Sequence, residues 1–277
     1  MSGVLERTLG ILELLSRHGE GLELGAIADE LNIPRSGVHR LLTDLVKCGY
    51  VRQTRDHGDY MLTTKLVSMG LSYLSNSGIV DIAQPLLNHL AEVSGELARL
   101  SVVDGERLTW VARAQGARQG LRYDPDMGSD ARLSCSSSGW AWLATLSDDE
   151  AMACLARQGL GKPEEFGPNA PTSLQAVMAQ VQATRERGYS VTVDTYSAGL
   201  SAFSAPVRFA NQPAMGVLTI AGPTVRLSDE RMQALAPELV NVAHQLAAAS
   251  SASPFFAKTG ASATGPVGTG RTPIYAP

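Results

Sequence analysis

The sequence predicts an α+β protein: an N-terminal winged helix-turn-helix domain, then a helix, then a C-terminal domain of helices and an antiparallel sheet. Three observations predict this class. A short helical segment leads directly into a longer amphipathic one, Ile33–Gly49. After Gly49 the apolar residues change from helical spacing to alternation, which is typical of strands. From Leu97 onward, strand-like runs alternate with helical ones, as in an α+β domain.

The segment Ile33–Gly49 has two chemically different faces at helical spacing. Its apolar stripe, typical of a helix packed on a small core, consists of Val38, Leu41, Leu42 and Leu45. The opposite face offers hydrogen-bond donors and positive charge from Arg35, Ser36, His39, Arg40, Thr43 and Lys47. Pro34 suits the first turn of this helix and Gly49 its end. We therefore expect the polar face to contact an anionic partner.

The preceding segments complete a three-helix unit. Val4–Arg17 repeats apolar residues at helical spacing, and Gly25–Leu31 is a second short helix. Only the tight connection Asn32–Ile33 separates Gly25–Leu31 from the basic helix. Two short helices joined by so brief a turn, the second with a basic face, predict a helix-turn-helix.

A β-hairpin is expected directly after the basic helix. The runs YVRQT and DYMLT flank Asp56-His57-Gly58, a cluster that favours a turn. Such a hairpin forms the wing of a winged domain and lies beside the DNA backbone. Arg52, Arg55 and His57 are then candidates for phosphate contacts. The alternative is that they are solvated charges of an exposed turn.

Charge is distributed as a DNA-binding first domain requires. The 277 residues carry a net charge of −4, but this average hides a division. Residues 1–32 hold two arginines against six acidic residues, whereas residues 33–65 hold six basic residues against three acidic ones. Phosphate binding needs a local basic face rather than a basic protein. The composition is therefore compatible with double-stranded DNA as a partner.

Cysteines and hydropathy narrow the class further. The three cysteines, Cys48, Cys135 and Cys154, form no C-x-x-C pair, which argues against a disulfide framework and a cysteine metal site. We expect buried, reduced thiols, no metal and no cofactor. No run approaches the roughly 20 apolar residues of a membrane span, and Met1–Gly10 lacks a signal-peptide core. These features predict a cytoplasmic protein without membrane contact.

The ordered motifs resemble the IclR family of bacterial transcription regulators. The shared signatures are P-R-S-x-x-H-R-L-L in the basic helix, then G-Y-V, then Y-x-L at the end of the hairpin. One departure is Gly37, where the family usually carries Thr and where glycine removes a side-chain contact. The DNA-binding residues implied are Arg35, Ser36, Gly37, His39, Arg40, Thr43, Arg52 and Arg55.

The resemblance also implies an organisation for the whole chain. Residues 1–63 would be the winged helix-turn-helix domain and residues 64–78 a linker helix that helps to pair two protomers. Residues 79–250 would be a GAF-like effector-binding domain. Residues 251–277, rich in Gly, Ser, Thr, Ala and Pro without any period, are expected to be a disordered tail. The partners are then a pseudo-palindromic operator and a second copy of the chain, as a homodimer or homotetramer.

Strand signals organise the second domain. LARLSVV and RLTWVAR flank Asp104-Gly105, a strong hairpin signal, and GLRYD at residues 120–124 is expected to add a third strand. Two further strand runs are Ala202–Val207 and Met215–Ala221. Together with the intervening helices these runs form an antiparallel α+β sheet domain.

The run Leu133–Ala141 is the candidate start of a ligand site. Its serines precede an apolar helix, where N-cap chemistry leaves amides that attract carboxylates, and we expect the free amides of Ser136–Gly139 to do so. The run occupies the position of the IclR effector-domain signature. Arg132, Ser134 and Trp140 replace the usual Pro, His and Lys of that signature.

By resemblance, the effector pocket combines this helix start with a residue after G-Y-S and inward positions of the last two strands. The residues implied are Ser136, Ser137, Ser138, Gly139, Trp140, Thr192, Ala202, Thr219 and Ala221. The alanines make the strand side less polar than is common in the family. With Trp110 and Tyr196 as possible neighbours, the pocket favours an aromatic or bulky organic acid, although each aromatic residue could instead be ordinary core.

Two other functions remain open from the sequence. A serine hydrolase would need a base beside S-S-S-G-W, but three of the five histidines, His18, His39 and His57, belong to the first domain, and no G-x-S-x-G motif occurs. The sequence contains no H-E-x-x-H motif, which is typical of zinc-dependent enzymes. The second alternative keeps the fold, with a sensor domain that only supports oligomerisation.

Overall fold

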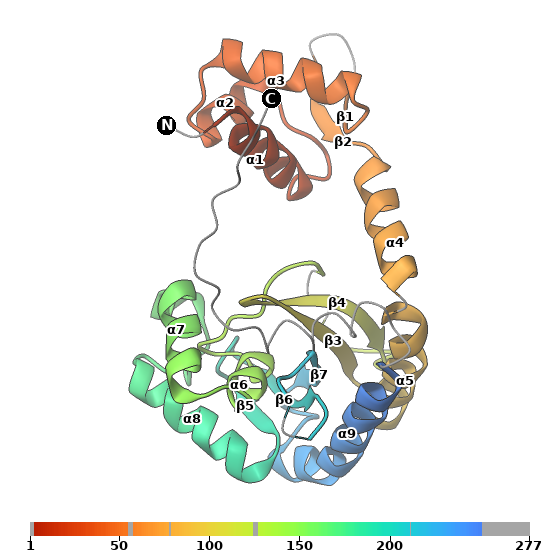
Figure 1. Cartoon of the computed structure of the whole chain (residues 1–277), viewed down its shortest axis with the longest axis vertical. Helices are drawn as coiled ribbons and strands as arrows, with labels where there is room; N and C mark the ends of the chain where they lie inside the picture. The colour runs from red at the N-terminus through yellow and green to blue at the C-terminus, as the bar shows by residue number, and fades with distance from the viewer. Residues whose placement is uncertain (1–2, 55–57, 78, 124–126, 211, 251–277) are drawn as a thin grey trace, which may run out of the picture. The chain divides into compact units, whose positions relative to one another are not determined.

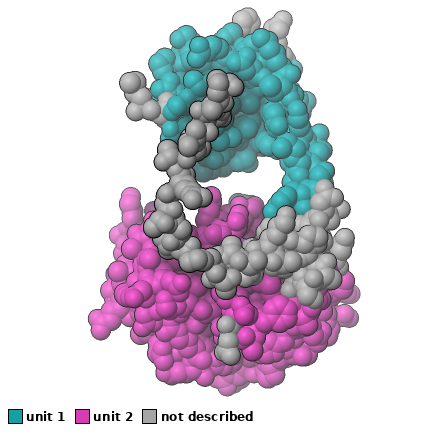
Figure 2. Space-filling view, viewed as in Figure 1, with its two compact units in different colours: residues 1–76 teal, residues 77–277 magenta. Residues whose placement is uncertain are grey.

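The computed structural model describes residues 3–54, 58–77, 79–123, 127–210 and 212–250. The chain divides into two compact units, residues 1–76 and residues 77–277, coloured teal and magenta in Figure 2. The expected disordered tail, residues 251–277, lies outside the described residues. Each unit has its own hydrophobic core and is described by itself.

The first unit is a three-helix core with a β-hairpin and one further helix. Its elements are α1 (Val4–Ser16), α2 (Leu24–Glu30), α3 (Arg35–Lys47), β1 (Val51–Gln53), β2 (Tyr60–Leu62) and α4 (Lys65–Ser77). The buried stripe of α3 is the expected one, Val38, Leu41, Leu42 and Leu45. It packs against Ile11, Leu15 and Ile27 of the first two helices.

Two left-handed backbone positions delimit α3. Asn32 adopts φ +50° in the turn after α2, a conformation that asparagine tolerates better than most residues. Gly49 adopts φ +77° just after the helix ends at Lys47. The hairpin follows, with Val51 paired to Leu62 and Gln53 to Tyr60. Pro34 immediately precedes the helix rather than occupying its first turn, and its backbone is extended there.

The second unit is a five-stranded antiparallel sheet with helices on both faces. Its elements are α5 (Ile79–Ser94), β3 (Leu97–Asp104), β4 (Arg107–Gln115), α6 (Ser137–Leu143), α7 (Asp148–Gln158), the 3₁₀ turn η1 (Pro163–Glu165), α8 (Leu174–Arg187), β5 (Ser190–Val193), β6 (Leu200–Val207), β7 (Gly216–Pro223) and α9 (Asp229–Ser250). The strand order is β4-β3-β7-β6-β5. Helices α5 and α9 cover one face, and α6 to α8 lie on the other side (Figure 1).

Alternation along the strands separates two cores. Leu100, Phe203 and Leu218 belong to the core under α5 and α9. Trp110 and Val217 belong to a second core, which also contains residues of α6, α7 and α8. On the α6 side of the central strands, polar residues also point inward, among them Arg99, Ser204 and Thr219. This is the face on which a site has to be sought.

The prediction of a third strand at residues 120–124 is wrong where it can be compared, because the described residues 120–123 are not in a strand. The outer edge of β4 is instead paired with the loop before α6: Trp110 N–H donates to the Ser129 carbonyl at 3.2 Å, and Ala131 N–H donates to the Leu108 carbonyl at 2.7 Å. The edge available to a further strand is thus already occupied. Strand β5, at the opposite edge of the sheet, was not expected from the sequence.

Candidate functional site

The polar face of α3 is open to solvent. Arg35, Ser36, His39 and Arg40 are exposed and Thr43 is half-buried. Ser36, Arg40, Thr43 and Lys47 follow one another at i, i+4, i+7 and i+11, on the side opposite the buried stripe. They form one continuous strip of hydrogen-bonding groups with two positive charges, which matches the phosphates and base edges of a groove.

Local contacts constrain one residue of this strip, Thr43, and two residues beside it, Gly37 and Arg35. The Thr43 hydroxyl donates to the His39 carbonyl at 2.8 Å, so towards solvent it can only accept. A Cβ on the half-buried Gly37 would lie 3.3 Å from a methyl group of Ile33, so the helix is closely packed there. The guanidinium of Arg35 lies beside Gly25 at the start of α2 rather than in line with Arg40.

The hairpin carries one described basic residue. Arg52 is exposed on β1, opposite Met61 of β2. Arg55 and His57 lie outside the described residues. Leu22, which precedes α2, forms two backbone hydrogen bonds with Tyr60, and this bridge ties the hairpin to the helical core.

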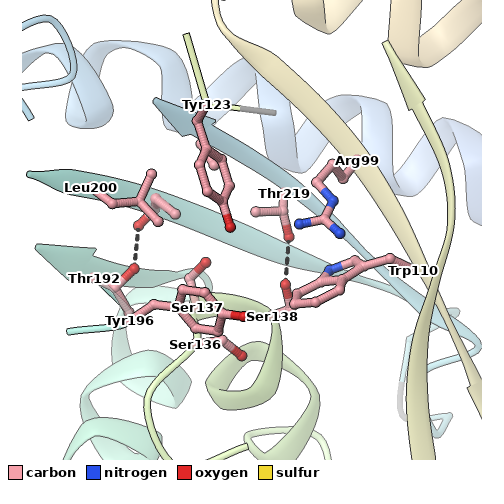
Figure 3. Close-up of a pocket in the computed structure, with 12 residues that line it drawn as sticks. Arg99, Trp110, Tyr123, Ser136, Ser137, Ser138, Thr192, Tyr196, Leu200 and Thr219 are labelled. Carbon is pink, nitrogen blue, oxygen red and sulfur yellow. Dashed lines mark hydrogen bonds between the residues drawn. The ribbon is translucent and has the colours of Figure 1, made fainter. Parts of the chain in front are cut away.

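A buried cavity opens in the second unit between α6 and the sheet (Figure 3). The space free of protein atoms amounts to about 340 Å³, and this figure includes open solvent at the mouth. Its lining is Arg99, Trp110, Tyr123, Ser136, Ser137, Ser138, Thr192, Tyr196, Leu200, Ala202, Thr219 and Ala221. Seven of the nine residues expected at an effector pocket are therefore brought together, and the expected neighbours Trp110 and Tyr196 join them.

Gly139 and Trp140, the other two expected residues, do not line this cavity. The Trp140 indole lies in the core shared with α7 and α8, and its N–H donates to the Ser134 carbonyl at 3.2 Å. Gly139 faces the loop before the helix, where a Cβ would lie 2.6 Å from the Leu133 Cα. Both point away because α6 turns only its first residues towards the sheet.

Two of the four amides expected to be free at the helix start are already hydrogen-bonded within the protein. Ser136 is the N-cap, as the serine run indicated, and its hydroxyl accepts the Gly139 N–H at 3.0 Å. The Ser136 N–H is itself donated to the Arg132 carbonyl. Among the described residues, only the amides of Ser137 and Ser138 remain from the four. With seven residues, α6 is also too short to contribute much of a dipole.

A chain of hydroxyl groups forms the floor of the cavity instead. Ser204 donates to Ser137 at 2.8 Å, Ser204 and Thr219 are 2.7 Å apart, and Thr219 and Ser138 are 2.9 Å apart. Because Ser204 has one proton and donates it to Ser137, it accepts from Thr219, which in turn accepts from Ser138. The Ser137 proton is left over at the end of this chain, ready to be donated into the cavity.

The opposite wall holds a cation among aromatic rings. The Arg99 guanidinium lies 3.7 Å from the centre of the Trp110 ring, and Arg99 is only 2% exposed. Burial lowers the pKa of Arg99 to about 10, so it remains charged at neutral pH. Burial also raises the pKa of the Tyr123 hydroxyl to about 12, so this group keeps its proton.

Two local irregularities aim the aromatic rings into the cavity. Arg99 pairs with Arg113 across β4, but a bulge between Leu100 and Ser101 places Trp110 opposite Ser101. Trp110 thereby comes onto the same face as Arg99. Tyr196 lies on the turn between β5 and β6, where Asp194 adopts φ +55° and accepts the Gly199 N–H at 2.6 Å. The rings of Tyr196 and Trp110 meet edge to face at 6.4 Å.

Three lining residues were not predicted from the sequence: Arg99, Tyr123 and Leu200. The sequence does contain a signal for Arg99, since it is a charged residue inside the apolar run LARLSVV. A buried charge needs polar or charged partners, and these indicate a site. Tyr123 was assigned to a strand that does not form. Leu200 lies just before the run taken as a strand, and only the true start of β6 brings it into the cavity.

Neither metal chemistry nor a membrane span finds support in the described residues. Within them, no group of three or more His, Cys, Asp and Glu residues is arranged to hold a metal ion. No helix in the described part of the chain is both long and apolar enough to cross a bilayer.

Comparison with known proteins identifies both units. Residues 4–55 match the IclR helix-turn-helix domain, and residues 71–248 match the C-terminal domain of bacterial transcriptional regulator IclR. The acetate operon repressor of Salmonella typhimurium is 28% identical over 243 residues, which are 87% of this chain and 88% of that protein.

Solved structures share the fold. An IclR transcriptional regulator from Alicyclobacillus acidocaldarius superposes with a TM-score of 0.77 at 23% identity, over 90% of this chain and 99% of that one. An IclR homologue from Microbacterium hydrocarbonoxydans complexed with 4-hydroxybenzoate gives 0.73 at 18% identity, over 89% and 100%. With the family motifs matched across both units, the chain belongs to the IclR family of bacterial transcriptional regulators.

Proposed function

We propose that α3 is the recognition helix and that it reads the major groove of operator DNA. The exposed strip Ser36, Arg40 and Thr43 faces the bases, with His39 and Gly37 at its edges. Arg35, drawn back over the start of α2, contacts a phosphate. Arg52 and Arg55 of the wing contact the backbone on one side. The strip's position opposite a fully buried stripe supports this assignment.

The cavity of the second unit is the proposed effector site. The observation that carries this proposal is the convergence of serine and threonine hydroxyls with aromatic rings around one buried space. Hydroxyl groups bind oxygen atoms of a small acid, whereas Tyr196, Leu200, Ala202 and Ala221 contact an apolar body. The effector is therefore a small organic acid with a bulky or aromatic body. The 4-hydroxybenzoate of the Microbacterium homologue is a ligand of this class, at an identity that shows only a shared fold.

Both alternatives are less well supported. The cavity lining, all of it described, contains no His, Asp or Glu that could activate a serine, so a hydrolase has no base at hand. A domain that only supported assembly would have no need for buried hydroxyl groups around an empty space, because filling it with apolar side chains would stabilise the fold more.

The protein acts as a homodimer, or as a homotetramer built from dimers, on a pseudo-palindromic operator in the cytoplasm. One recognition helix reads only a few base pairs, so specificity requires two half-sites. The helix α4 offers a surface for pairing, because Val67, Met69, Leu71 and Tyr73 are each more than half exposed. Apolar side chains exposed in this number on one helix are typical of an interface.

The test is a thermal-shift screen of aliphatic and aromatic acids, followed by operator binding with each hit. A ligand of the folded state must raise the midpoint of unfolding. A true effector also changes operator affinity by about 5- to 150-fold, the usual range of allosteric coupling. If no acid raises the midpoint and operator affinity never responds, the assembly-only function replaces the effector site.

A further inference from the structure

We propose that Arg99 and Trp110 form the anion-anchoring subsite of this pocket, so that it selects a planar monocarboxylate over the corresponding neutral amide. This inference rests on the proposed effector site and deepens it. Recognition of the carboxylate is thereby assigned to strands β3 and β4 rather than to the start of α6, where the sequence predicted it.

Arg99 places a buried positive charge in the wall of the cavity. Arg99 is on the second strand of the sheet, paired with Thr219 of β7, and its guanidinium lies beside Thr219 in Figure 3. A cation with 2% of its surface exposed has lost nearly all of its hydration. The neighbouring Arg113 adds positive charge and opposes the charge on Arg99 further. A carboxylate in the cavity would replace the lost hydration, whereas a neutral amide would do so only weakly.

The same wall of the cavity holds a hydrogen-bond donor, the indole N–H of Trp110. Trp110 is 5% exposed and lines the cavity, and its Nε1–H has no hydrogen-bond partner among the described residues. Buried donors are nearly always bonded, so an unmet one in a cavity wall points to a ligand. The guanidinium covers the face of this ring at 3.7 Å, and the bound carboxylate is therefore expected where the ring edge and the guanidinium meet.

Two further groups of the lining, the hydroxyls of Tyr123 and Ser137, are hydrogen-bond donors. The Tyr123 hydroxyl accepts a hydrogen bond from Arg99 and points into the space between Leu200 and Thr219 in Figure 3. Because burial raises its pKa, it keeps its proton and can donate that proton to a ligand. The Ser137 proton is the free end of the hydroxyl chain. Both of these donors suit an acceptor-only group, which a carboxylate is and an amide is not.

The apolar side of the cavity limits the shape and charge of the rest of the ligand. The side of the cavity formed by Leu200, Ala202 and Ala221 is an apolar cluster, with the rings of Tyr123 and Tyr196 packed against it. A second carboxylate there would lose its hydration without compensation. A planar ring with one carboxylate satisfies both sides of the pocket.

The experiment compares benzoate, 4-hydroxybenzoate and benzamide by calorimetry on the full-length protein and its variants. Arg99→Met should weaken binding of the two acids by about 10- to 100-fold, the range for hydrogen bonds to a charged group. Trp110→Phe, which keeps an aromatic ring but removes the indole N–H, should weaken them by about 10-fold. Benzamide binding should change by less than about 3-fold in both. Arg113→Met is the matched control, because it removes the same side chain at the paired position of β4, and should leave the acid-to-amide ratio near that of the wild type.

The ratio of acid to amide affinity separates selectivity from damage to the fold. If Arg99→Met does not fold, Arg99→Lys carries the test, since the retained charge should preserve the preference for acid. Equal acid binding by wild type and Arg99→Met overturns the subsite and leaves the effector site standing. Where Arg99→Lys carries the test, loss of the preference for acid in Arg99→Lys, or an unchanged acid-to-amide ratio in Trp110→Phe, has the same consequence. Failure of every acid in the wider screen to bind wild type overturns both.

Discussion

At the scale of single residues, the two sites place their charges in opposite environments. Arg40 is exposed to water on α3, where it is proposed to contact a DNA base. Arg99 is buried on β3 and has no such freedom, because the Trp110 ring holds its guanidinium. An exposed arginine contributes to affinity only through the groups that it contacts in the complex. A buried arginine already lowers the stability of the protein through its lost hydration, and a bound anion can offset that loss.

Arg40→Ala should weaken operator binding by about 1–3 kcal/mol and relax specificity at one position of each half-site, because a bidentate contact to guanine is lost. Fluorescence anisotropy with wild-type and mutated operators at fixed salt measures this. Arg52→Ala serves as the comparison and should weaken all sequences alike while lowering the salt slope by about 1. An Arg40→Ala protein that binds its operator as tightly as wild type would remove α3 from the groove.

Ala221→Trp should abolish the effector response. Ala221 is 3% exposed and pairs with Ala202 of β6 on the apolar side of the cavity, so a large ring there fills the space for a ligand. Overpacking will also lower the free energy of unfolding by about 1–3 kcal/mol. Operator binding without ligand is the control and should remain. A normal response to the effector in this variant would mean that the ligand binds elsewhere.

At the scale of elements, the position of β3 is fixed at its first residues. Glu96 lies just before the strand, its side chain only 5% exposed, and it accepts two hydrogen bonds from Arg226 at 2.6 and 2.9 Å. Arg226 follows β7, so this bidentate pair ties together the two strands that carry Arg99 and Thr219. There is no room beside it, since a Cβ on Gly222 would lie 2.4 Å from a Glu96 oxygen.

Arg226→Met should lower the free energy of unfolding by about 1–3 kcal/mol, because a buried carboxylate loses its partner. The partial exposure of Arg226 keeps the figure below that of a fully buried pair. Urea denaturation measures the change. Arg107→Met removes the exposed pair with Asp130 and should cost under about 1 kcal/mol. Equal losses in the two variants would show that the Glu96 pair is no more than a surface ion pair.

At the scale of the whole molecule, the proposed homodimer would present two copies of α3 to the two half-sites of an operator. The chain is an IclR-type, ligand-responsive DNA-binding transcriptional regulator. In the proposed dimer, the exposed apolar side chains of α4 provide a surface for pairing. Val67 and Leu71 lie one turn apart on this helix, so a partner could bury both at once.

Leu71→Glu should shift the protein from dimer towards monomer at micromolar concentration and weaken operator binding, because a buried carboxylate at the interface would lack a partner. Light scattering after size exclusion gives the mass. Ser72→Glu adds the same charge at the next, exposed position and should leave the mass unchanged. A wild-type monomer that binds one half-site with full affinity would overturn the dimer itself.

The sequence by itself determined most of the elements and the faces of the amphipathic ones. The stripe of α3, its basic side, the Ser136 cap and the hairpin at Asp104-Gly105 were all readable, because spacing within one element reports how that element is oriented towards its own core. Family motifs then placed most of the cavity lining. They could do so because the strands of a relative keep the same register.

Only the tertiary structure decided which side chains meet. The bulge after Leu100 turns Trp110 onto the face of Arg99, the loop before α6 occupies the edge that a third strand would have used, and the short α6 directs Trp140 away from the sheet. None of these follows from a period, because each depends on how two elements pack and where one residue is gained or lost in a pairing. The lining of the pocket depends on all of these packing details. The sequence therefore showed its cation, Arg99, only as a charged residue within an otherwise apolar strand.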